Sequence, residues 1–185
     1  MALMRGWLYA VVARPPAVGG KVKSFDATAA KKVPGVVDVQ EIPAFKGAPL
    51  FQPLGGVAVL ANSTWAAWQG RDALEIDWDL GANATYDTDE FAKELKATVN
   101  KPGTVVRAEG NAAEAMSKAA KVVKADYAVP HLSHAPMETP CAVADVKTNA
   151  EGKVTSCHVL TATQNPQAAQ QAVGRAMGML SLIHI

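Results

Sequence analysis

The stretch of residues 127–140 (YAVPHLSHAPMETP) constrains the fold more than any other part of the chain. Just before and into it, apolar and polar residues alternate over residues 123–129, which predicts a half-buried strand. Pro130, Pro136 and Pro140 then exclude a helix or a regular strand ladder. An apolar run of strand length, residues 141–146, follows. We therefore expect a loop between two strands, a place where functional sites commonly lie.

This loop carries His131, His134 and Glu138. Two histidines three residues apart with a nearby carboxylate suggest a zinc site, but that motif requires both histidines on one helical turn. Because the prolines exclude such a helix, the sequence does not favour a zinc hydrolase. Cys141 and Cys157 could pair, or could be small buried hydrophobic residues. Neither belongs to a CxxC motif, so we predict no metal site within this chain.

Charge and hydropathy exclude two classes of partner. The net charge of the 185 residues is +1, and lysine and arginine are scattered, which gives no electrostatic footprint for nucleic acid. No apolar run approaches the ~20 residues of a membrane-spanning helix. The first residues lack the three regions of a signal peptide.

Residues 1–81 read as one α+β unit. Strands are predicted at 8–13, from residue 22, and at 36–42, 57–61 and 75–79, with a proline- and glycine-rich loop at 43–56. Asn62 and Ser63 cap a helix that reaches Leu74. Trp65 and Trp68 share a face of this helix, so we expect both in the core. The turn-rich residues 81–86 mark the boundary.

Residues 82–179 read as a second unit. Asp87 and Asn111 each start a helix and are followed three residues later by a glutamate. Strands are predicted at 121–129, 141–146 and 154–162, the last two antiparallel. Asn165 followed by Pro166 starts a helix that Gly178 ends. The junction 161–166 (TATQNP) thus brings hydroxyl and amide groups to a helix N-terminus, which suits an anion such as a pyrophosphate or serves only as a cap.

Several separated blocks resemble a known family. Residues 8–39 (LYAVVARPPAVGGKVKSFDATAAKKVPGVVDV) and 57–79 (VAVLANSTWAAWQGRDALEIDWD) resemble the a/b hammerhead domain of molybdenum hydroxylase large subunits. Residues 121–146 carry a version of the family's H-A-x-M-E-P loop, one residue longer before the proline. Residues 161–178 resemble the family's T-Q-N/S-P helix start. The chain is thus similar to the large, molybdopterin-binding subunit of the xanthine dehydrogenase and aldehyde oxidase group, most of all to the isoquinoline 1-oxidoreductase beta subunit.

This resemblance implies an α+β fold with three parts: an a/b hammerhead-like domain at 1–81, a partial molybdopterin-binding domain at 82–179, and a foreign or truncated tail at 180–185. It also implies a chain truncated at both ends. The family's glycine-rich loop and base glutamate would then lie beyond the chain end. We accordingly assign no catalytic residue here and expect this fragment alone to be inactive.

The resemblance further implies that Gln164 and Asn165 lie near the pterin, and that His134 and Glu138 order the loop beside the cofactor or the substrate funnel. The cofactor would be molybdenum-molybdopterin, in its cytosine dinucleotide form, held by the full subunit and not by this fragment alone. Aldehydes or N-heterocycles would be oxidised with water as the oxygen source, and electrons would pass to a small [2Fe-2S] subunit. Members of this branch are often exported to the periplasm. The alternative is a non-catalytic α+β binding or scaffolding module of the same fold.

Overall fold

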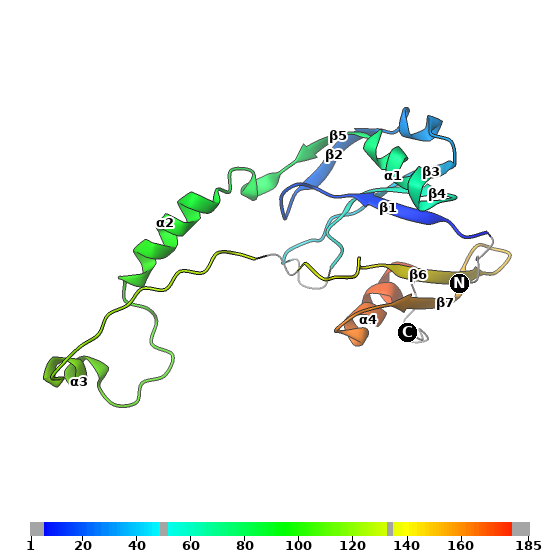
Figure 1. Ribbon diagram of the computed structural model, residues 1–185. Coiled ribbons are helices and arrows are strands. Elements are labelled where there is room, and N and C mark those ends of the chain that lie inside the picture. The colour runs from blue at the N-terminus through cyan, green and yellow to red at the C-terminus, as the bar shows by residue number, and fades with distance from the viewer. Residues whose placement is uncertain (1–5, 49–51, 133–134, 179–185) are drawn as a thin grey trace. The chain divides into compact units, whose positions relative to one another are not determined.

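The computed structural model describes residues 6–48, 52–132 and 135–178 (Figure 1). It is a mixed helix and sheet structure, as predicted, and its sheets are open. In chain order its elements are β1 (Tyr9–Ala13), β2 (Lys21–Asp26), η1 (Ala30–Lys32), β3 (Val36–Ile42), β4 (Gly56–Ala61), α1 (Thr64–Asp72), β5 (Glu75–Asp79), η2 (Gly81–Asn83), α2 (Thr88–Val99), α3 (Ala112–Lys118), β6 (Ala142–Thr148), β7 (Val154–Thr161) and α4 (Pro166–Met177). Three parts are described in turn: the sheet unit (6–86), the connecting segment (87–140) and the hairpin with its helix (141–178).

The sheet unit contains two small antiparallel sheets. One has the strand order β1-β4-β3 and the other pairs β2 with β5. Strand β4 is apolar throughout and lies between two neighbours, which explains why Val57 and Val59 are fully buried. Helix α1 packs against β1 and β4, while η1 packs against β3. The strands and the helix predicted for this part are therefore confirmed.

Helix α1 turns a face of small residues toward the sheet. Its buried residues are Ala66, Ala67 and Gly70. A β-carbon at Gly70 would lie 2.8 Å from methyl groups of both Val36 and Val59. The helix thus lies too close to the sheet for a large side chain on this face.

The prediction that Trp65 and Trp68 lie in the core is wrong. Trp65 is 68% exposed and Trp68 is 47% exposed. Their shared face exists, but it points away from the sheet because the alanine and glycine face of α1 occupies the close contact with β4. The helical spacing correctly predicted that the two tryptophans share a face, but that face is not the buried one.

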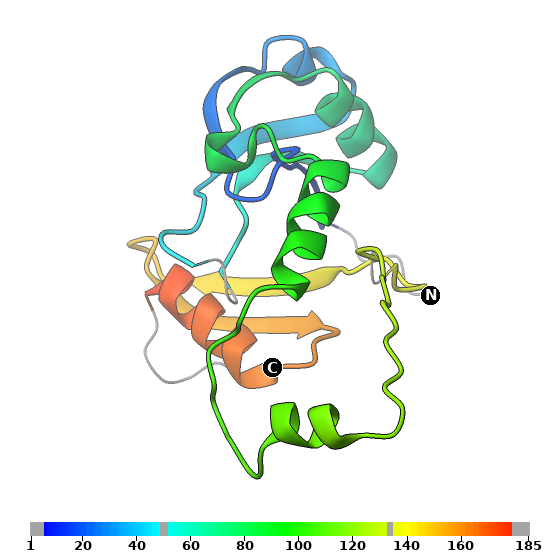
Figure 2. The same ribbon diagram turned by 90° about the vertical axis from the view of Figure 1, so that its left-hand side faces the viewer.

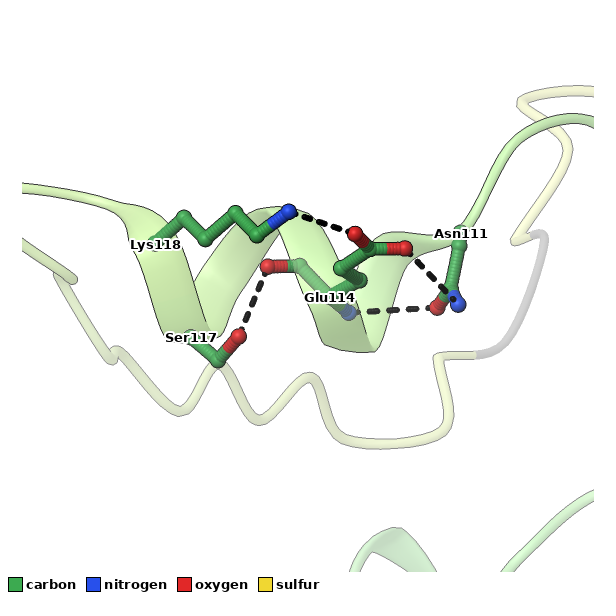
Figure 3. Close-up of polar contacts among 4 residues, drawn as sticks. All are labelled: Asn111, Glu114, Ser117 and Lys118. Atoms are coloured by element: carbon green, nitrogen blue, oxygen red, sulfur yellow. Dashed lines mark hydrogen bonds and ion pairs between the residues drawn. The ribbon is translucent and has the colours of Figure 1, made fainter.

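In the connecting segment, both helices begin at the predicted caps. The Asp87 carboxylate accepts hydrogen bonds from the backbone N–H groups of Asp89 and Glu90 at the start of α2. At α3 the Asn111 side chain accepts from the Glu114 backbone N–H at 3.1 Å, and Lys118 forms an ion pair with Glu114 (Figure 3). Neither helix buries a residue. Leu95 and Val99 of the apolar stripe of α2 are 48% and 72% exposed.

The strand predicted at 121–129 is also wrong: the structure assigns no strand there. The segment has the alternation of a strand, yet Val123, Tyr127 and Val129 are 78%, 91% and 83% exposed. A strand is defined by its ladder, and among the described residues β6 and β7 pair with each other rather than with this segment. Residues 123–129 have the sequence pattern of a strand, but no strand of the described residues pairs with them.

Residues 141–178 form the predicted hairpin followed by a helix. Strands β6 and β7 pair antiparallel from Ala142 opposite Thr161 onward, and the Asn149 side chain accepts backbone hydrogen bonds within the turn. Helix α4 runs alongside this hairpin (Figure 2). Cys157 and Val159 are buried on β7. Both cysteines are free thiols, Cys141 exposed and Cys157 buried, so the hydrophobic interpretation holds for Cys157.

No helix in the described ranges is both long enough and apolar enough to cross a membrane.

Candidate functional site

The junction between β7 and α4 has the local structure that its sequence predicts. The Asn165 side-chain oxygen accepts a hydrogen bond from the Ala168 backbone N–H at 3.0 Å, and Pro166 occupies the first turn of α4. The Asn165 backbone N–H donates to the Thr163 hydroxyl at 3.1 Å. Asn165 is thus a helix cap, held in place from both sides.

Gln164 lies next to this cap and is exposed. It precedes a helix whose first N–H groups carry a partial positive charge. From residue 152 onward the chain contains no aspartate or glutamate. An anion placed at the junction would therefore meet amide and hydroxyl groups and no nearby carboxylate from this stretch of sequence.

The exit of the proline-rich loop is tied to the same end of the hairpin. The Thr161 hydroxyl donates to the Cys141 carbonyl at 3.1 Å, and Ala142 pairs with Thr161 in the ladder. Cys141 directly follows the loop in the chain, and residue 162 directly leads to the TQNP junction. The hairpin register thus places Cys141, the first residue after the loop, beside Thr161, the end of β7 at which the junction begins.

The loop itself is only partly described. His134 lies outside the described residues, so its predicted role stays a prediction. Glu138 is exposed, and Ala135 has a φ of 37°, a left-handed value that is unusual for a residue with a β-carbon. Such backbone strain is found often at functional sites.

His131 stacks on Phe91 of α2, with ring centroids 5.5 Å apart and an interplanar angle of 25°. Sequence analysis identified His131 but missed this partner. No sequence signal pointed to Phe91, which lies 40 positions away in the chain.

Within the described ranges, no three His, Cys, Asp or Glu side chains gather in a way that could hold a metal ion. The residues at the junction do fit part of an organic anionic cofactor. The helix N-terminus and the amide and hydroxyl groups suit phosphate or pterin oxygen and nitrogen atoms, which accept and donate hydrogen bonds.

Comparison with known proteins matches part of the chain to a family. Residues 96–181 match the molybdopterin cofactor-binding domain, a range that includes the proline-rich loop and the TQNP junction. The chain is also 32% identical over 146 residues to a membrane-bound aldehyde dehydrogenase [pyrroloquinoline-quinone] of Gluconacetobacter polyoxogenes. Together these similarities support a fragment of a molybdopterin-binding subunit of the xanthine oxidase family.

A solved structure agrees with this fold. Quinoline 2-oxidoreductase from Pseudomonas putida 86 superposes over 96% of this chain with a TM-score of 0.61, at 20% sequence identity. The α+β fold expected from the resemblance is therefore confirmed. The chain spans 18% of the length of the aldehyde dehydrogenase and 26% of the quinoline 2-oxidoreductase chain.

Proposed function

We propose that this chain forms part of a larger molybdenum-containing oxidoreductase subunit that oxidises aldehydes or N-heterocycles with water as the oxygen source. The observation that carries this proposal is the cofactor-binding family match over residues 96–181, within which lie the capped junction and the loop. The aldehyde dehydrogenase similarity favours aldehydes among the two substrate classes.

Two cofactors are suggested by the relatives. The family match names molybdopterin, whereas the name of the aldehyde dehydrogenase includes pyrroloquinoline quinone. We favour molybdopterin because the family match covers both candidate motifs of this chain. We further propose the cytosine dinucleotide form, since its pyrophosphate would suit the exposed N-terminus of α4. The bound cofactor would supply the oxygen transfer and accept the electrons.

The residues of this chain would bind and position, and none would act as the base. Gln164 would donate its side-chain amide to the cofactor, and Asn165 would hold the helix N-terminus in place beneath it. His134 and Glu138 would order the loop between residue 130 and Cys141. These residues would thus form one wall of the active site, and another part of the subunit would supply the base glutamate.

The remaining features of the assembly are part of the same proposal. Electrons would leave through a small [2Fe-2S] subunit, and the cofactor-binding domain would follow a hammerhead-like domain that ends near residue 81. The connecting segment fits this proposal, because other parts of a larger protein would cover its exposed apolar residues.

The test uses the complete polypeptide that contains this sequence, purified with its partner subunits. We expect molybdenum and a fluorescent oxidised pterin in about equal amounts, cytidine monophosphate on acid hydrolysis, and turnover of an aromatic aldehyde faster than of quinoline. Pyrroloquinoline quinone without molybdenum would overturn the cofactor assignment. A complete protein that holds neither cofactor and turns over neither substrate would instead favour the scaffolding module.

Substitutions at Asn165 separate capping from cofactor binding. Asn165→Asp keeps an N-cap acceptor and should leave thermal stability unchanged, because aspartate caps as well as asparagine and favours the helix dipole. Its negative charge should nevertheless lower retention of an anionic cofactor about tenfold. Asn165→Ser serves as the control, since it also caps but stays neutral and should retain the cofactor. We expect Asn165→Ala to lose about 1 kcal/mol of stability. Full cofactor content in Asn165→Asp, measured by pterin fluorescence, would contradict the proposed position.

A further inference from the structure

The sheet unit contains a cavity of about 400 Å³ that opens at the surface. It lies between the end of β1, the end of α1 and strand β5. Its lining residues are Val12, Ala13, Arg14, Arg71, Leu74, Ile76 and Trp78. The volume falls within the ~300–1,000 Å³ typical of small-molecule sites. None of these residues belongs to the loop or to the TQNP junction.

Two arginines line this cavity, and the guanidinium group of each is anchored by hydrogen bonds on one side. Arg14 donates from Nη1 to the Gly55 carbonyl at 3.0 Å. Arg71 donates from Nε and Nη2 to a single oxygen of Asp72, at 2.9 and 2.6 Å. These bonds leave other N–H donors on both groups. An anchored guanidinium loses less freedom when it binds a ligand, so both are prepared to receive an anion.

The charge around the cavity favours a ligand with one negative charge. No acidic residue lines the cavity, but Asp72 balances one of its two arginines. The two arginines and Asp72 together carry a net charge of +1, which a ligand with one negative charge would neutralise. A carboxylate matches this charge and the fork of a guanidinium better than a dianion does.

The remaining walls are apolar and fixed. Leu74 and Ile76 are half-buried and pack against the core cluster that contains Val57 and Val59. Trp78, also half-buried, adds an aromatic surface. These walls would cover the hydrocarbon body of a ligand whose charged end faces the arginines.

We propose that this cavity is a second binding site, for a small monocarboxylate with a flat apolar body. The site belongs to the sheet unit and stands independently of the proposed oxidoreductase function. Its specificity comes from two features together: Arg14 and Arg71 bind the carboxylate, and Leu74, Ile76 and Trp78 contact the ring.

The experiment is a ligand-observed NMR titration of the 185-residue chain with benzoate. We expect saturable binding with a dissociation constant on the order of 1 mM, in keeping with a small ligand in an open site. Benzyl alcohol, which lacks the charge, and acetate, which lacks the ring, should each bind about tenfold more weakly. Inorganic phosphate should also bind more weakly. Equal binding of benzyl alcohol or phosphate would overturn the assignment of a carboxylate.

Three arginine variants locate the site. Arg71→Gln should weaken benzoate binding about tenfold, because it removes a charge-assisted contact. Arg14→Lys keeps the charge and a donor toward Gly55 but loses the fork, so a smaller loss is expected. Arg107→Gln is the matched control: Arg107 also pairs with a nearby carboxylate, that of Glu109, but does not line the cavity. Unchanged affinity in Arg71→Gln, or an equal loss in Arg107→Gln, would overturn the proposal. Thermal melting of each variant confirms that the fold is kept.

Discussion

Gly56→Ala is expected to unfold the sheet unit at markedly lower denaturant concentration than the original sequence. Gly56 has a φ of 131°, which side-chain-bearing residues rarely adopt. A β-carbon there would collide with the carbonyl oxygen of Ala13 on the paired strand β1. Because the obstacle is backbone, the strands themselves must separate. Backbone strain and overpacking together should remove about 3 kcal/mol or more.

Gly47→Ala is the matched control for this effect. Gly47 also has a positive φ, of 76°, but no atom of the described residues lies within 4 Å of the position its β-carbon would take. Only conformational strain remains, so we expect a loss of about 1 kcal/mol. Urea denaturation followed by tryptophan fluorescence measures both variants, because all four tryptophans lie at or before residue 78. Equal losses in the two variants would show that the contact with β1 is not what requires glycine at 56.

Val59→Ala is expected to produce the second large loss of stability. Val59 is fully buried in the central strand β4 and belongs to the core cluster with Ala30, Val39 and Val57. It also lies against Gly70 of α1, where there is no side chain to fill the space that truncation creates. Lost burial and the residual cavity together should remove about 2 kcal/mol.

Val37→Ala provides the comparison on the same sheet. Val37 lies on β3 but is 59% exposed, so its truncation should change stability by no more than about 0.5 kcal/mol. The same denaturation measurement applies to both variants. A loss at Val37 as large as that at Val59 would mean that another part of the protein covers this face of β3.

The sequence predicted those features that depend on local chemistry. Ser63, Asp87, Asn111 and Asn165 were all expected to cap helices, and each accepts a backbone N–H at the start of its helix. Capping requires only a side-chain oxygen within three residues of the bonded N–H group. The hairpin β6–β7 was likewise predictable, because its partner strand follows after one short turn.

The features that the sequence could not give depend on distant partners. The alternation over 123–129 indicates a strand, but no local signal supplies the second strand of a ladder. For α1, helical periodicity identifies a face without stating which face the sheet approaches, and the small residues Ala66, Ala67 and Gly70 decided it. A glycine between alanines on one face is a signal of close packing that could have been used.

The candidate site was predictable only in part. Asn165 and its helix were located by sequence, while the link from Thr161 to Cys141 follows from the strand register. The stacking of His131 on Phe91 depends on how the segment between them folds back, which no residue pattern specifies.

The strand pairings described above imply an order of folding. In the sheet unit Tyr9 pairs with Ala61 and Lys21 with Asp79, so much of the chain must be brought together before either sheet exists. In the hairpin Thr148 pairs with Val154 across a single turn, and such a closure takes only about 1–10 μs. Long loops must be closed before distant strands gain contacts, which slows their assembly. The hairpin β6–β7 can therefore form early, before the strands of the N-terminal sheets have paired.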